Sequence, residues 1–404
     1  MPISSSAARA ARESVPVLAP DRAAPGRSGA ERESSRQRAT RRLFMKLAAL
    51  GALPSAPAAG QAPESSLSRA ASSVGLVFGS DSDVPVADAP AAYADLLIRH
   101  CDLYAPNLAW TWVQPEATSP DPAATDPNIR FALAHDMRLT GAHLLWHEAL
   151  PRWFEELNSK QAAERAALRH IRALARHYAG HVLSWNVVNE AIEPRNHRPD
   201  GLRRSPLLSQ LGPDLFGAAY HAAREADPNA LLLYNDYGLE MATEDAAERR
   251  RALLGLLDRL IATKVPIDGV GLQTHIRLDG SRFDERIYRT FLSEISARGI
   301  KIFITEMDVL DLLPFVSIED QDRRIAAVYS NMLQVALDET SVKALVVWGL
   351  SDRYTWLTAE SGPQYVRRDG LPNRPLPFDE NFRPKPAYTA IMSAIKHAPR
   401  RSGI

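Results

Sequence analysis

The sequence predicts an α/β protein, a (β/α)8 barrel built as a single domain. Eight short apolar segments, rich in β-branched residues, alternate with longer segments whose apolar residues recur every three to four positions. The short segments are almost continuously apolar, which is typical of strands buried on both faces of a parallel sheet. Eight strand–helix units over roughly 325 residues fit a closed barrel with extended loops.

The barrel is expected over residues 74–397. Its strands are predicted at residues 74–79, 101–107, 140–146, 182–188, 230–235, 269–274, 301–305 and 343–348. The clearest helical patterns between them cover residues 162–178 and 246–264. A doubly wound open sheet is the structural alternative. No glycine-rich G-x-G-x-x-G turn follows the first strand, which argues against a dinucleotide-binding version of that sheet.

Composition excludes several classes of partner. The 404 residues carry 48 basic and 48 acidic side chains, whereas proteins that bind nucleic acid or anionic membranes usually have a basic excess. The single cysteine, Cys101, allows no intrachain disulfide. Hydrophobic residues make up 45% of the chain, enough for a large core.

The N-terminal region, residues 1–58, is predicted to be disordered and to end in an export signal. The pair Arg41-Arg42, Phe44 and Lys46 precede a short apolar run and small-residue cleavage sites such as Ala56-Pro57-Ala58, and the order resembles a twin-arginine signal. We therefore expect export by the twin-arginine machinery to the periplasm or the medium, with residues 59–73 as a linker. The alternative is an arginine-rich tail followed by a few alanines. No apolar run approaches the ~20 residues that span a bilayer, so no membrane association is expected after signal removal.

Polar residues gather where the predicted strands end, which is where barrels of this kind carry their chemistry. Glu190 follows strand four and Glu306 follows strand seven. Two carboxylates flanking a cleft can break a glycosidic bond, one as proton donor and the other as nucleophile or base. The alternative is that both are ordinary ion-pair partners. The other strand-end residues are Trp146, His147, Asn189, Asn235, Asp236, Tyr237, Gln273, Thr274, His275, Asp308 and Trp348, with Asp352 and Trp356 close behind.

Several segments resemble the signatures of glycoside hydrolase family 10, the endo-β-1,4-xylanase family. They read WHEALPRW, WNVVNEAIEP, LYNDYGLE, IDGVGLQTHI, FITEMDV, VVWGLSDRYTWL and PLPFDENFRPKPAY. They occur in the family's order and extend over about residues 75–395. The resemblance implies hydrolysis of a β-1,4-linked polysaccharide with retention of configuration, without a metal or other cofactor, and we expect a monomer.

By that resemblance Glu190 is the general acid/base and Glu306 the nucleophile. A retaining mechanism needs the two carboxyl groups about 5–5.5 Å apart. The pKa of Glu190 should be raised while the negative charge of Glu306 is nearby, and should fall once Glu306 is esterified.

The resemblance also assigns residues that bind the sugars. Asn189 matches the residue that bonds the 2-hydroxyl, His275 the histidine that holds the nucleophile, and His147 a histidine of the subsite next to the cleavage point. The remaining matches to the binding pocket are Gln273, Trp348, Trp356 and Asn107. Asn235, Tyr237 and Asp308 are expected to support the site, with plain structural hydrogen bonding as the alternative.

The second strand departs from the family pattern E-N-x-M-K-W. Ala105 and Ala109 replace the Glu and Lys, Asn107 is kept only if one residue is deleted, and Ala142 replaces a histidine further on; Asn186 replaces an Asp. Xylan is the default substrate, but the changes leave open another β-linked glycan, such as an exopolysaccharide, or a noncatalytic carbohydrate-binding relative.

A metal-dependent barrel hydrolase is a further alternative. It would use His147, Glu148, His275 and Asp308 as ligands. No H-x-H or H-E-x-x-H pattern supports it.

Overall fold

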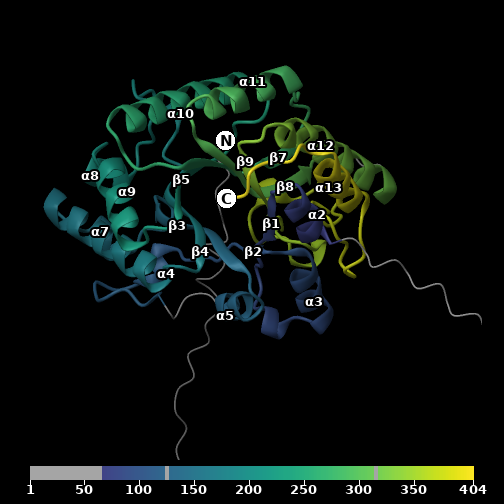
Figure 1. Cartoon of the computed structure of the whole chain (residues 1–404), viewed down its shortest axis with the longest axis horizontal. Helices are drawn as coiled ribbons and strands as arrows, with labels where there is room; N and C mark the ends of the chain where they lie inside the picture. The colour runs from purple at the N-terminus through teal and green to yellow at the C-terminus, as the bar shows by residue number, and fades with distance from the viewer. Residues whose placement is uncertain (1–65, 123–126, 314–316) are drawn as a thin grey trace, which may run out of the picture. The chain divides into compact units, whose positions relative to one another are not determined.

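The strands form a closed parallel barrel in the computed structural model, which describes residues 66–122, 127–313 and 317–404 (Figure 1). Around the barrel run β6-β5-β4-β3-β2-β1-β9-β8, and a pairing of β6 with β8 closes the ring. The bounds are β1 Val77–Ser80, β2 Leu103–Tyr104, β3 Arg138–Trp146, β4 Val182–Asn189, β5 Leu231–Asp236, β6 Gly269–Leu272, β8 Lys301–Asp311 and β9 Val342–Val347. The predicted (β/α)8 fold is confirmed.

A further short strand, β7 (His275–Leu278), pairs only with the second half of β8, with His275 opposite Asp308. The sequence predicted one strand over residues 269–274 and a strand that stopped at residue 305. Instead the chain breaks at Thr274, which takes a left-handed φ of 60°, and β8 continues to Asp311 because β7 supplies its partner. Glu306 and Asp308 therefore lie within a strand.

Helices surround the strands (Figure 1). The predicted helices at 162–178 and 246–264 are confirmed as α7 and α10, each beginning after a side-chain N-cap, Ser159 or Thr243. The helix bounds are α2 Leu67–Ser73, α3 Ala91–His100, α4 Trp110–Val113, α5 Pro127–Ala134, α6 Arg152–Glu155, α7 Lys160–His177, α8 Pro206–Leu211, α9 Leu215–Ala226, α10 Glu244–Ala262, α11 Glu285–Ser296, α12 Ile318–Asp338 and α13 Pro386–His397. Single 3₁₀ turns cover Val86–Asp88, Pro194–Asn196, Asp352–Tyr354 and Pro363–Tyr365.

Apolar side chains pack against both faces of the barrel strands. The larger cluster lies between the strands and the helices, whereas a smaller one occupies the barrel interior. The interior cluster consists of Leu103, Ala105, Leu183, Leu233, Phe303, Ala344 and Val346. The barrel is therefore a packed core rather than a pore, and polar chemistry is confined to its ends.

A helix begins directly after Ser66, inside the segment 59–73 that the sequence predicted as a linker. Helix α2 packs against β1 and α13, with Leu67 and Ala71 fully buried. The Ser66 hydroxyl accepts a hydrogen bond from the Arg69 amide and caps the helix. Helix α2 has only seven residues and is rich in serine and alanine. Its apolar pattern is too short to predict a helix from the sequence.

The proposed export signal, including Arg41 and Arg42, lies outside the described residues. Within the described part of the chain, no helix is long and apolar enough to cross a membrane.

Candidate active site

The two glutamates are joined by one chain of amide groups at the carboxyl end of the barrel. Asn235 Nδ2 donates to Oε1 of Glu306 at 2.8 Å and to Oδ1 of Asn189 at 2.9 Å. Asn189 Nδ2 in turn donates to Oε1 of Glu190 at 3.2 Å. The ends of β4 and β5 and the middle of β8 thus bring Glu190 and Glu306 into one site, as the sequence predicted.

Two residues with a left-handed backbone conformation orient the side chains of this site. Glu190 has φ of 54° and Thr274 has φ of 60°, a region that non-glycine residues rarely occupy. The Glu190 backbone is held by its amide, which donates to Asn235 O at 2.9 Å, and by Arg203 Nε, which donates to its carbonyl at 2.7 Å. The bend at Thr274 turns Gln273 toward Glu190 and His275 toward Glu306.

The Glu190 carboxyl is suited to carry a proton. Burial raises its pKa to about 8, and Glu148 and Asp236 add to the rise, while a hydrogen bond from Gln273 opposes it. The sequence predicted correctly that the pKa of Glu190 is raised. The main cause is burial, however, and not the charge of Glu306. Oε1 accepts from Asn189 and, at 3.0 Å, from Gln273 Nε2. Because both are N–H donors, Oε1 acts as an acceptor, and Oε2 is the oxygen suited to carry the proton.

The Glu306 carboxylate is held ionised. Burial alone would raise its pKa, but His275, with further help from His143 and Asn235, outweighs burial and lowers it. His275 Nε2 lies 3.0 Å from Glu306 Oε2. Burial would lower the pKa of His275, yet the carboxylates of Asp308 and Glu306 raise it well above its usual value. His275 is therefore an imidazolium that stabilises the charge on Glu306.

Asp308 holds His275 in place from the other side. Its Oδ1 lies 3.0 Å from His275 Nδ1, and its Oδ2 accepts a hydrogen bond from Trp356 Nε1 at 2.7 Å. The rings of Trp356 and Trp348 stand edge-on to the imidazole, with centroids at 5.4 and 6.3 Å. Trp348 is only partly buried, which leaves ring surface for a sugar.

Tyr237 contacts the site only through Arg203 in the described contacts. The Tyr237 hydroxyl accepts from Arg203 at 3.0 Å, and Arg249 lies 4.6 Å above the tyrosine ring. Arg203 comes from the loop after β4. The sequence did not predict it as a site residue, because it belongs to no strand end and no periodic pattern. Asn235, in contrast, touches Glu306 directly and is fixed by Thr305, which donates to its Oδ1 at 2.8 Å.

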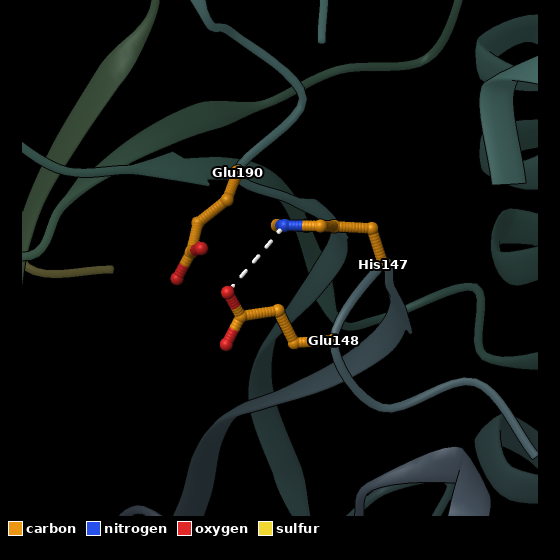
Figure 2. A group of neighbouring side chains, drawn as sticks. All are labelled: His147, Glu148 and Glu190. Carbon is orange, nitrogen blue, oxygen red and sulfur yellow. Dashed lines mark ion pairs between the residues drawn. The ribbon is translucent and has the colours of Figure 1, made fainter. Parts of the chain in front are cut away.

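His147 and Glu148 point toward Glu190 (Figure 2). His147 Nε2 lies 3.7 Å from Glu148 Oε1, and each of the three residues offers a ligand atom within 4.8 Å of the others. Burial, followed by the charge of Arg203, lowers the pKa of His147 to about 3, so the imidazole is neutral. These three groups could hold a divalent ion. They are not the predicted metal set, because His275 lies between Glu306 and Asp308 instead.

Asn107 lies in the loop after β2 and is exposed, where its Oδ1 accepts from the Ala109 amide at 3.4 Å. This hydrogen bond is local to the loop. Two groups near Glu306, the buried Asp81 and the partly buried His143, were not found from the sequence. Asp81 directly follows the first strand, so a survey of every strand end would have included it.

The arrangement defines the class of protein. A glutamate with a raised pKa and a glutamate with a lowered pKa are linked through two amides at the carboxyl end of a (β/α)8 barrel, with indoles nearby. This is the equipment of a glycoside hydrolase. The chain belongs to glycosyl hydrolase family 10, whose model matches residues 66–394.

Individual relatives agree with the family. The chain is 31% identical over 307 residues to endo-1,4-beta-xylanase B of Thermotoga neapolitana, covering 75% of this chain and 83% of the relative. It is 33% identical over 300 residues to endo-1,4-beta-xylanase A of Cellvibrio japonicus, covering 67% of this chain but 46% of that longer protein. The crystal structure of xylanase 10B from Thermotoga petrophila RKU-1 with xylobiose is similar at a TM-score of 0.73 and 28% identity, covering 83% of this chain and 99% of that one.

Proposed function

We propose that this protein is a retaining endo-β-1,4-glycanase that hydrolyses xylan-type polysaccharide. The observation that carries the proposal is the opposite protonation of its two glutamates. Burial raises the pKa of Glu190 to about 8, whereas His275 and its neighbours lower that of Glu306. Near neutral pH one is an acid and the other a nucleophile before any substrate arrives.

Each step follows from these states. Glu190 Oε2 protonates the glycosidic oxygen while a Glu306 oxygen attacks the anomeric carbon, which breaks the glycosidic bond and forms a glycosyl ester. The leaving sugar carries away the proton, so Glu190 is now a carboxylate. It then removes a proton from water, which attacks the anomeric carbon and releases Glu306. Configuration is inverted twice and hence retained.

The surrounding residues supply binding. Asn189, fixed by Asn235 and Gln273, presents its amide to the sugar 2-hydroxyl, and His147 bonds the sugar next to the cleavage point. Trp348, which is only partly buried, and Trp356, which packs in the same apolar cluster, supply the indole rings for the sugar. Asn107 contributes from the loop after β2 only if that loop reaches the sugar.

Xylan is favoured because the relatives named above are xylanases by name. Another β-linked glycan is the second candidate, because Ala105 and Ala109, in the segment that follows β2, replace the charged residues of the family pattern. The retained catalytic pair argues against a noncatalytic binding protein.

We also propose export to the periplasm or the medium by the twin-arginine route, as a monomer. The support is the order of Arg41-Arg42, Lys46, apolar run and Ala56-Pro57-Ala58 in the sequence. Fusing residues 1–60 to a reporter, with and without Arg41→Lys and Arg42→Lys, tests this; export of the doubly substituted fusion contradicts it.

Hydrolysis of soluble glucuronoxylan by the purified protein tests the function, with Glu306→Ala as control. Release of xylo-oligosaccharides that disappears in the variant is the expected result. Cleavage of a different β-glycan but not of xylan would keep the mechanism and replace the substrate. No cleavage of any β-glycan would overturn the enzyme assignment.

A further inference from the structure

Asp81 stands at the mouth of the barrel between two elements of the site. It directly follows β1, whose last residue, Ser80, is opposite Val347 of β9 and Tyr104 of β2. The next residues along those strands are Trp348 and Ala105, and the Ala105 amide donates to Ser80 O at 3.0 Å. Asp81 is therefore level with the tryptophan of the sugar pocket on one side and with the second-strand segment on the other.

The side chain of Asp81 is buried but incompletely bonded. It is 5% exposed, and its Oδ1 has no hydrogen-bond partner among the described residues. Buried polar atoms without partners are rare because they lose their bonds to water on folding and gain none in return. At the mouth of an active-site barrel, such an atom has a ready explanation: its partner belongs to the ligand.

The groups around Asp81 place it on the side of the nucleophile. Burial raises its pKa well above the usual value, and the carboxylates of Asp83, Glu306 and Asp308 raise it further. Asp81 is thus an uncharged carboxylic acid near neutral pH. Its hydroxyl can donate one hydrogen bond and its carbonyl oxygen can accept another, the pair of roles that a sugar hydroxyl complements.

The segment that follows β2 carries alanines at two positions where the family pattern has charged residues. Ala105 and Ala109 are both 5% exposed and carry only a methyl group. Asp81 is therefore the buried carboxyl group that this edge of the mouth presents to a ligand held against Trp348, whereas its neighbour Asp83 is exposed.

We propose that Asp81 is a specificity-determining residue that hydrogen-bonds a hydroxyl of the glycone, the sugar on the Glu306 side of the scissile bond. The inference rests on the proposed cleavage between Glu190 and Glu306. It adds a substrate contact from the residue that follows β1. This residue lies beside the segment after β2 that carries Ala105 and Ala109.

Aryl β-glycosides of xylobiose and cellobiose test the proposal, with Asp81→Ala, Asp81→Asn and the exposed Asp88→Asn as matched control. On the substrate that the unaltered enzyme cleaves best, Asp81→Ala should lower kcat/KM by about tenfold or more, the size of one lost hydrogen bond. Asp81→Asn, whose amide also donates and accepts, should lose less, and Asp88→Asn should lose nothing. The melting temperature of Asp81→Ala should be unchanged or higher, because an unpaired buried polar atom has been removed.

A series of monodeoxy glycones separates contact from structural support. The penalty of Asp81→Ala should disappear for the analogue that lacks the contacted hydroxyl and persist for the others. An equal penalty for every analogue, or a fall in kcat/KM that accompanies a fall in melting temperature in both Asp81 variants, overturns the proposal. So does an active enzyme in which both Asp81 variants are within twofold of the unaltered protein.

Failure of the proposed function can be distinguished from failure of the Asp81 proposal by the activity of the unaltered enzyme. An unaltered enzyme that prefers cellobiosides overturns xylan as the substrate while Asp81 is still tested on that glycone. An unaltered enzyme that cleaves no β-glycoside overturns both.

Discussion

Asn235 and Glu306 are joined by a hydrogen bond of 2.8 Å, and the same amide nitrogen reaches Asn189 at 2.9 Å. One side chain therefore fixes both Glu306 and Asn189, the residue that bonds Glu190. Since Asn235 Oδ1 is taken by Thr305, the amide cannot flip without losing three contacts. The relative placement of Glu190 and Glu306 thus depends on a residue that takes no part in bond breaking.

The roles of the two glutamates can be separated by azide. In Glu306→Gly, azide can enter the vacated space and attack the anomeric carbon once, giving an α-glycosyl azide. In Glu190→Gly, Glu306 still forms the ester and azide opens it, giving a β-glycosyl azide. Without azide we expect Glu306→Gly to lose on the order of 10⁴-fold or more of kcat, as for other nucleophiles that act within a unit. NMR of the azide products checks the two roles. A β-glycosyl azide from Glu306→Gly and an α-glycosyl azide from Glu190→Gly would show that the two roles are reversed.

The pH profile should have its alkaline limb near the pKa of Glu190, about 8, because loss of that proton removes the acid. Glu148→Gln should move this limb to lower pH, since the Glu148 charge raises the pKa of Glu190. Burial is the larger cause, so the limb should stay above 4.5, the ordinary value for glutamate. The measurement is kcat/KM against pH. Glu156→Gln, an exposed carboxylate paired with Arg152, is the control and should leave the limb in place.

The sequence predicted most of this site because its residues sit at strand ends, and strand ends are visible as the point where an apolar run stops. It did not predict the break at Thr274, since a β-branched residue is a poor candidate for a left-handed φ and only the contacts of Gln273 and His275 compensate for it. It also ended β8 too early, because the partner that extends this strand, β7, exists only after that break.

Arg203 shows a different limit of sequence reading. It reaches the Glu190 carbonyl and Tyr237 from a loop, and its contacts are made in space rather than along a periodic pattern. The opposite holds for α7 and α10, which were predicted within two residues because their apolar periodicity and N-caps are local.

Removing the Glu190 carboxylate should stabilise the protein at alkaline pH. The folded-state pKa, about 8, lies above the ordinary 4.5, so the folded protein binds this proton more tightly than the unfolded chain. The associated stability is complete below pH 4.5 and is lost as pH rises toward 8. Glu190→Gln cannot ionise, so its melting temperature should exceed that of the unaltered protein by an amount that grows between these two values. A constant difference across the range would contradict the raised pKa.

Chelation should leave activity unchanged. Glu306 has protein partners on both oxygens, and the group that could gather an ion, His147, Glu148 and Glu190, includes the acid that must carry a proton. Dialysis against EDTA followed by assay should recover full activity. Added Zn²⁺ should instead inhibit, because binding displaces the Glu190 proton, and Glu148→Gln should weaken that inhibition. Activity that EDTA abolishes and a divalent ion restores would return the metal-dependent hydrolase to consideration.

Gly271→Ala should disable the site without contacting substrate. A Cβ at Gly271 would overlap Asn235 Oδ1 and lie 2.9 Å from Thr305 Cγ2, so the Asn235 side chain has to move. Its displacement would release Asn189 and Glu306 together, and we expect kcat to fall by about 10²-fold, as for other small misplacements of catalytic groups. Gly255→Ala is the matched control: it lies in α10, where a Cβ would have only an ordinary 3.7 Å contact with Arg259, and alanine favours the helix. Kinetics and melting temperatures of both variants check the argument. A Gly271→Ala enzyme with unaltered kcat would show that the bridge through Asn235 does not set the geometry of the two glutamates.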